Sequence, residues 1–127
     1  MKHFFTLSFL AVFLSSFFLM RVGIDDVIAA MKTGNAAMVA KYFDNSVEIS
    51  MPDKSNSYSK SQAELVLKDF FLSSPVKSFD IIHKGENAGS EYCIGTLLTK
   101  NGAYRTTIFM KQKGDKQVLQ ELRFENR

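Results

Sequence analysis

Apolar residues recur at two different spacings along the chain, and the change of spacing divides it into two halves. Across residues 24–75 they mostly recur every three to four positions, the spacing of one face of an α-helix. From Val76 onward apolar and polar residues alternate, which is the period of a β-strand. The predicted order of elements is helix, helix, strand, short strand, helix and four further strands. This order makes the fold class α+β.

The first helix is predicted from residues at both of its ends. Asp25 and Asp26 favour a helix start, because the exposed N–H groups there carry partial positive charge. Gly34 is expected to end this helix in the left-handed conformation, and Asn35 to cap the next one. The apolar face of the first helix consists of Ile24, Val27, Ile28 and Met31.

The second helix is expected to bury its apolar side chains and to end at residues 44–45. Those side chains are Val39, Tyr42 and Phe43. Residues 47–51 then alternate as a strand, and Pro52 ends it. Residues 53–59 are polar and turn-rich, with Tyr58 as the candidate for a short second strand.

The third helix is the clearest element of the sequence. A capping box is predicted at its start, formed either by Ser59 with Gln62 or by Ser61 with Glu64. Pro75 marks its end. Its apolar stripe consists of Ala63, Val66, Leu67 and Phe70, with Phe71 beside it.

Four strands are predicted at residues 76–84, 92–100, 104–113 and 118–125. Residues 85–89 are expected to form the first turn and Gly114-Asp115 the last. Between them, Asn101-Gly102 is a strong signal for a two-residue hairpin loop. With these two residues as the loop, Lys100 would face Ala103 across the strands.

This register assigns the two faces of the central hairpin. The face expected to lie under the helices pairs Leu97 with Thr106, Gly95 with Ile108, and Cys93 with Met110. The other face pairs Leu98 with Arg105, Thr96 with Thr107, Ile94 with Phe109, and Tyr92 with Lys111. That second face is expected to be solvated or to form a dimer contact. In the last hairpin, a two-residue turn would bury Leu119 and Glu121. A three-residue turn would instead bury Val118, Leu122 and Phe124. The three-residue turn is preferred, because its side chains pack better.

The N-terminus has the pattern of a secretory signal peptide. Lys2 and His3 precede an apolar run over residues 4–20. No A-x-A-like cleavage triplet follows the run, so an uncleaved membrane anchor is the alternative. Residues 1–23 are therefore predicted to be a signal peptide or anchor, and residues 24–127 a single domain. The protein is expected to be exported, periplasmic or secreted, or held at the membrane if the leader stays.

Composition removes several classes of protein. The whole chain has 16 Lys and Arg against 13 Asp and Glu, and removal of the leader leaves 14 basic residues against the same 13. A nearly balanced charge does not favour nucleic-acid binding. The single cysteine excludes a disulfide framework within one chain.

The order of elements resembles the cone-shaped fold of nuclear transport factor 2 and ketosteroid isomerase. More specifically, residues 61–85 look like an uncharacterised family of small exported bacterial proteins with this fold. The residues that carry this resemblance are Gln62, Ala63, Val66, Leu67, Phe70, Phe71, Pro75, Val76, Ser78, Phe79, His83 and Gly85. The resemblance implies three helices in the N-terminal half, packed on a curved, mostly antiparallel sheet. It implies no activity, because this superfold hosts enzymes, ligand binders and dimer modules.

His83 is a candidate for a general base, as the only histidine after the leader. Its strand period places it on one face with Phe79 and Ile81, near the pocket mouth of such a fold. Asp80 would then lie on the opposite face, so the two could not form a catalytic dyad. Together with His83, the candidate residues of a ligand pocket are Tyr42, Tyr58 and Tyr104.

The remaining reactive side chains are read as structural. Cys93 is expected to be a small buried residue, and Asp44 a capping or turn residue. A lysine cluster at the last hairpin tip, Lys111, Lys113 and Lys116, is expected to protect the sheet edge. No cofactor motif and no metal-ligand set is recognised.

These observations favour an exported, non-enzymatic domain. It is expected to bind a small molecule or a protein partner in the cavity between helices and sheet, and to dimerise through the outer sheet face. One alternative is a small isomerase, dehydratase or hydrolase that uses His83 and a pocket tyrosine. A second alternative is a structural envelope protein.

Overall fold

The computed structural model describes residues 23–127, so the predicted leader falls almost entirely outside the described residues. The helices are α2 (Ile24–Lys32), α3 (Ala36–Ala40) and α4 (Lys60–Ser73). The strands are β1 (Phe43–Ser50), β2 (Ser55–Ser59), β3 (Val76–Asn87), β4 (Ser90–Thr99), β5 (Gly102–Lys113) and β6 (Lys116–Asn126). This arrangement confirms the predicted α+β class.

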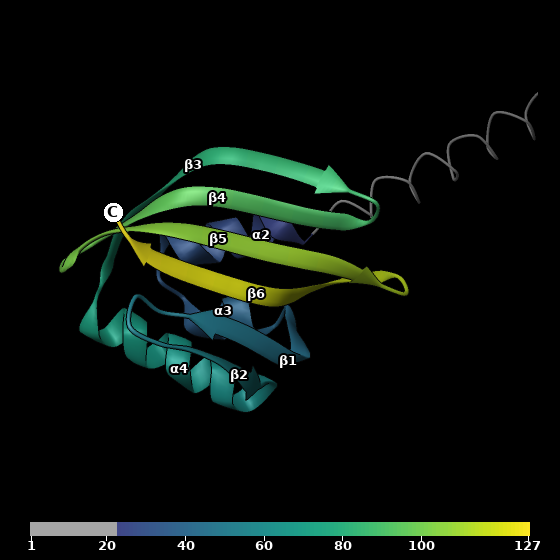
Figure 1. Cartoon of the computed structure of the whole chain (residues 1–127), viewed down its shortest axis with the longest axis horizontal. Helices are drawn as coiled ribbons and strands as arrows, with labels where there is room; N and C mark the ends of the chain where they lie inside the picture. The colour runs from purple at the N-terminus through teal and green to yellow at the C-terminus, as the bar shows by residue number, and fades with distance from the viewer. Residues whose placement is uncertain (1–22) are drawn as a thin grey trace, which may run out of the picture.

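The six strands form one curved sheet in the order β2-β1-β6-β5-β4-β3. Every neighbouring pair is antiparallel except β1 and β6, which are parallel. Figure 1 shows the three helices on one side of the sheet, with α4 beside β1 and β2. The core lies between these layers and includes Leu67 of α4 and Leu97, Ile108, Leu122 and Phe124 of the sheet, all fully buried.

The caps predicted in the N-terminal half are present. Gly34 adopts a left-handed φ of 64°, and the Asn35 side chain accepts a hydrogen bond from the Met38 N–H at 3.1 Å. Helix α3 is shorter than predicted, because Phe43 belongs to β1 and not to a helix. The Leu119 N–H of β6 donates to the Tyr42 carbonyl at 2.6 Å, so the sheet takes up the backbone group that a longer helix would have used.

Helix α4 begins with the capping box formed by Ser59 and Gln62, the first of the two predicted pairs. Ala63, Leu67 and Phe71 are buried, while Val66 and Phe70 are partly buried against the same core. The predicted stripe therefore faces the sheet.

The register predicted for the β4–β5 hairpin is wrong by two residues. Cys93 pairs with Ile108 and Thr99 with Gly102, so Lys100 and Asn101 form the loop. The Asn101 amide donates to the Ser73 carbonyl at 2.7 Å and to Ser74 Oγ at 3.0 Å, which ties this loop to the end of α4. Because a two-residue shift keeps every side chain on its face, the predicted core face is still the buried one.

The last hairpin combines the two predicted turns. Its loop has two residues, with Lys113 paired to Lys116, but a β-bulge follows at Gln120. Leu119 therefore faces the core before the bulge, and Leu122 and Phe124 face it afterwards. The preferred three-residue turn is wrong, although two of its three core residues are right.

Within residues 23–127, no helix is both long enough and apolar enough to cross a bilayer.

Candidate functional site

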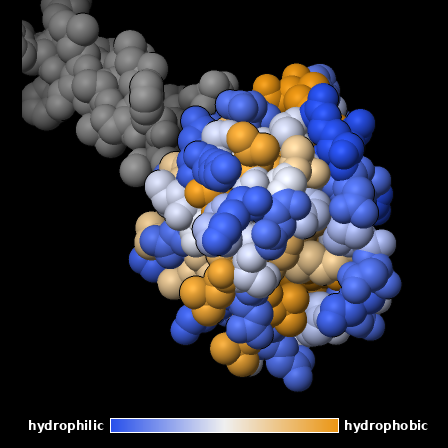
Figure 2. Space-filling model, turned by 90° about the vertical axis from the view of Figure 1, so that its left-hand side faces the viewer, coloured by the Kyte–Doolittle hydropathy of each residue, from blue (hydrophilic) through white to orange (hydrophobic). Residues whose placement is uncertain are grey.

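A hollow of about 490 Å³ opens between α4, the β1–β2 loop and the start of β5. We call it the α4–sheet hollow. Its lining residues are Met51, Pro52, Asp53, Lys54, Val66, Asp69, Phe70, Ser73, Ser74 and Tyr104. Its volume lies within the range typical of small-molecule sites. Figure 2 shows the end of the molecule at which the chain's C-terminus lies. Apolar surface forms separate small patches there, between hydrophilic side chains.

Two aromatic rings form one wall of the α4–sheet hollow. The ring centroids of Phe70 and Tyr104 lie 5.4 Å apart at an angle of 76°, so the rings meet nearly at right angles. Phe70 also packs on the buried Phe124, with centroids 4.7 Å apart. The helix α4 and the core thus hold this corner of two rings in place, which suits the recognition of a flat or compact apolar group.

The rim of the α4–sheet hollow is polar. Met51 and Lys54 exchange backbone hydrogen bonds, which fixes Pro52 and Asp53 in a tight turn above α4. Asp53, Lys54 and Asp69 make no ion pair with any residue of the described part of the chain. The Tyr104 hydroxyl makes no hydrogen bond to residues 23–127 either. A hydroxyl and three charged groups are thus available to a bound molecule.

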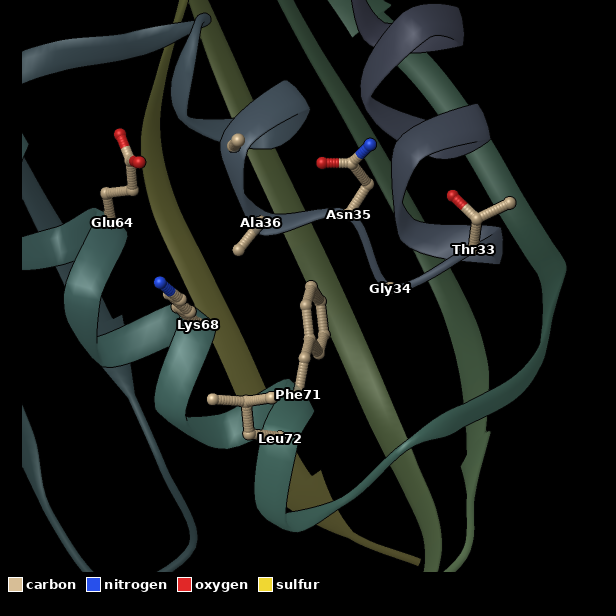
Figure 3. A pocket seen from close by; sticks show the side chains of 9 residues that line it. Thr33, Gly34, Asn35, Ala36, Glu64, Lys68, Phe71 and Leu72 are labelled. Carbon is tan, nitrogen blue, oxygen red and sulfur yellow. The ribbon is translucent and has the colours of Figure 1, made fainter.

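A second hollow, of about 480 Å³, lies between the α2–α3 turn and α4; we call it the α3–α4 hollow. Figure 3 shows the Phe71 ring standing toward Gly34, with Glu64 and Lys68 projecting from α4 at one end. Asn35 is already used as a helix cap. Its charged lining residues are one acid, Glu64, and one base, Lys68, so its lining has no net charge, and the α3–α4 hollow is a suitable comparison site.

Of the four residues predicted for a ligand pocket, only Tyr104 lines one of these two hollows. The Tyr42 hydroxyl donates to Asp26 Oδ2 at 2.7 Å, and this bond to a carboxylate raises the tyrosine pKa to about 12. Tyr58 lies on the edge strand β2 and pairs with Val47. The structure therefore does not gather the tyrosines into one site.

The face predicted for His83 is wrong. A bulge at Ile82 adds one residue to β3, so Ile81 opposes Gly95 and His83 opposes Ile94. Gly95 belongs to the buried face and Ile94 to the outer one, and the extra residue therefore turns His83 away from the helices. His83 Nε2 lies 2.7 Å from the hydroxyl of Tyr92.

The same bulge overturns the prediction for Asp80. It pairs with Thr96, which is on the outer face, so Asp80 and His83 share a face after all. Both side chains are exposed, and no hydrogen bond joins them.

Strand β3 also continues through Gly85, where a turn was predicted. A Cβ atom at Gly85 would lie 2.7 Å from the Tyr92 hydroxyl oxygen. A glycine in a strand signals such a close approach, and it was the available clue to this pairing.

The remaining reactive groups have structural surroundings. Cys93 is fully buried, and desolvation raises its thiol pKa to about 11, which disfavours the nucleophilic thiolate. Asp44 accepts hydrogen bonds from Lys113 at 2.9 Å and from Gln120 at 3.1 Å, and these lower its pKa. Asp44 thus joins β1 to the bulge of β6. Within the described range, no cluster of His, Cys, Asp or Glu is arranged to hold a metal ion.

A family model described as "Domain of unknown function (DUF4783)" matches residues 24–125. A solved structure of a DUF4783 family protein from Bacteroides uniformis is 32% identical, covers 81% of this chain and 95% of its own, and superposes with a TM-score of 0.78. The corresponding protein from Bacteroides ovatus is 28% identical, with 80% and 93% coverage and a TM-score of 0.78.

At the level of the fold alone, an NTF2-like protein of unknown function from Cytophaga hutchinsonii is also similar. It is 10% identical, with 80% and 83% coverage and a TM-score of 0.58. A search of the curated proteins found no match.

Proposed function

The chain belongs to the DUF4783 family of NTF2-like domains, and we propose that it is an exported, non-enzymatic module that binds a small ligand in the α4–sheet hollow. The observation that carries this proposal is the Phe70–Tyr104 corner, an aromatic wall that remains partly accessible and whose Tyr104 hydroxyl makes no hydrogen bond within residues 23–127. Small-molecule sites typically combine such apolar walls with a few polar groups. The pattern of residues 1–23 supports export.

The position of His83 counts against the alternative of an enzyme that uses His83 together with a pocket tyrosine. The histidine lies on the outer sheet face beside Tyr92, whereas Tyr104 points to the helix side. A general base must reach the proton that it removes within hydrogen-bond distance or through one water. His83 and a molecule in the α4–sheet hollow are on opposite sides of the sheet.

The test compares the protein recovered from the envelope of its own cells before and after unfolding, dialysis and refolding. A ligand that binds only the folded state raises the melting temperature, and dialysis of the unfolded chain removes it. We expect the recovered protein to melt at a higher temperature than the refolded protein. Equal melting temperatures would count against a retained ligand.

Two tryptophan variants locate the ligand. Val66→Trp places a large ring in the α4–sheet hollow and should abolish the difference in melting temperature. Ala37→Trp places a large ring in the α3–α4 hollow and should preserve the difference in melting temperature. The natural chain has no tryptophan, so the fluorescence of each variant also reports whether its hollow remains folded.

We also propose that two copies associate through the outer face of the sheet. Ile94 and Phe109 are only half-buried there, and Leu98 is 42% exposed. The same face carries both charge signs, including Arg105 paired across strands with Glu125. A face with both signs can meet its own copy without net repulsion.

A further inference from the structure

We propose that the ligand of the α4–sheet hollow is a small organic cation, an ammonium group on an apolar body. This inference rests on the proposed function and adds the chemical class of the ligand. Three separate features of the hollow favour a positive charge: its aromatic corner, the end of α4 that faces it, and its rim.

The aromatic corner offers a π-face to a cation. Phe70 and Tyr104 are nearly perpendicular, so a group that enters the corner meets the face of one ring and the edge of the other. A ring face carries partial negative charge and attracts ammonium groups that lie within about 6 Å of its centre. Val66 and Met51 extend the same surface with apolar atoms for the body of the ligand.

The C-terminal end of α4 also lines the hollow. Phe70, Ser73 and Ser74 belong to its last turn and cap, and the last turn contains no basic residue. The C-terminus of a helix carries a partial negative charge of about half an electron. Neutral donors take up two of the terminal carbonyls, since Ser73 Oγ donates to the Phe70 carbonyl at 3.1 Å and the Asn101 amide to the Ser73 carbonyl at 2.7 Å, but no basic side chain of the last turn cancels the dipole.

The rim adds an excess of carboxylates. Asp53 and Asp69 face one ammonium group, that of Lys54, and none of the three is ion-paired within the described residues. Lys54 is an exposed turn residue with a long flexible stem, so it can extend toward water. Two aspartates against one lysine give the lining of the hollow one net negative charge.

The protein is recovered from the cell envelope, and unfolding, dialysis and refolding remove any bound ligand. It is then titrated with two probes of the same shape. Choline carries a quaternary ammonium group, and 3,3-dimethylbutan-1-ol replaces its nitrogen with carbon. Ligand-observed NMR measures both dissociation constants. We expect choline to bind about tenfold more tightly than the neutral alcohol, as for a partly desolvated cation–π site.

Matched carboxylate variants on one helix locate the charge effect. Asp69→Asn removes a rim carboxylate and should weaken choline binding severalfold while leaving the neutral alcohol unaffected. Glu64→Gln changes a carboxylate of α4 that lines the other hollow (Figure 3) and should leave both probes unaffected. Tyr104→Phe keeps the ring and should keep the preference for the cation, whereas Tyr104→Leu should lose most of it.

The outcomes separate this inference from the proposed function. Equal binding of choline and the neutral alcohol would contradict the preference for a cation, while the proposal of a ligand-binding hollow would stand. An equal effect of Glu64→Gln and Asp69→Asn would contradict the α4–sheet hollow as the place where choline binds. Binding of neither probe would overturn the inference, while the comparison of recovered and refolded protein would still decide the proposed function. A melting profile of each variant shows whether a loss of binding reflects unfolding.

Discussion

At the scale of single residues, hydrogen bonds to carboxylates decide which polar side chains are available. Tyr42 is bound to Asp26 and Asp44 to Lys113 and Gln120, so neither is free for a ligand. Tyr104 has no such partner within the described chain and lies in the α4–sheet hollow. The sequence offers Tyr42, Tyr58 and Tyr104 as equivalent candidates, because a partner 16 residues away, such as Asp26 for Tyr42, cannot be read from local spacing.

The Tyr42–Asp26 bond predicts a loss of stability at high pH. The pKa of Tyr42 rises from 10.0 to about 12 in the folded protein, so its contribution is fully present below pH 10 and is lost as the pH rises toward 12. Tyr42→Phe should cost about 1 kcal/mol at neutral pH and should show a weaker decline over this range. Denaturant unfolding of both proteins between neutral pH and pH 12 measures the difference. Parallel declines in the two proteins would show that the bond is not the cause.

At the scale of elements, the helix caps and the core face of the β4–β5 hairpin were predictable, whereas the strand pairing and the bulges were not. The capping signals of Asn35 and Ser59 are local, and the structure contains both caps. The β4–β5 register instead depends on Asn101, whose amide bonds to Ser73 and Ser74 at a distance of 27 to 28 residues along the chain. The bulges at Ile82 and Gln120 change faces without any local signal, and the first of them misplaced His83.

The capping box of α4 gives a prediction with an internal control. Ser59 accepts a hydrogen bond from the Gln62 N–H, and Gln62 reaches back to the Ser59 N–H. Ser59→Ala should therefore destabilise the fold by about 1 kcal/mol. Ser61→Ala, at the other predicted cap position, should change the free energy of unfolding by less than about half of that. Similar values for the two variants, from denaturant unfolding, would contradict the assignment of the cap.

At the scale of the whole molecule, the resemblance read from residues 61–85 is confirmed as family membership. The fold itself selects no activity, since the same architecture supports many functions. In the described residues, fully buried side chains form the core under the sheet, and two hollows lie at the flanks of α4. The mouth of the α4–sheet hollow depends on the β1–β2 turn, a tertiary neighbour that no helical pattern reveals.

Association through the sheet predicts a change of mass in solution. Phe109→Glu places a charge at the centre of the proposed contact and should shift a dimer to monomer in sedimentation velocity. Leu72→Glu charges an apolar residue of α4 that is 70% exposed, and it should leave the dimer intact. A monomeric wild type would overturn the proposed contact, and a monomer from Leu72→Glu alone would move it to the helix side.

If the α4–sheet hollow holds a small molecule in the cell, native mass spectrometry of the protein detects it as added mass. The protein is recovered from the envelope of its own cells and sprayed without denaturation, beside Val66→Trp and Ala37→Trp. We expect extra non-protein mass on the wild type and on Ala37→Trp, and none on Val66→Trp. Bare protein in all three spectra, or the same extra mass on all three, would contradict it.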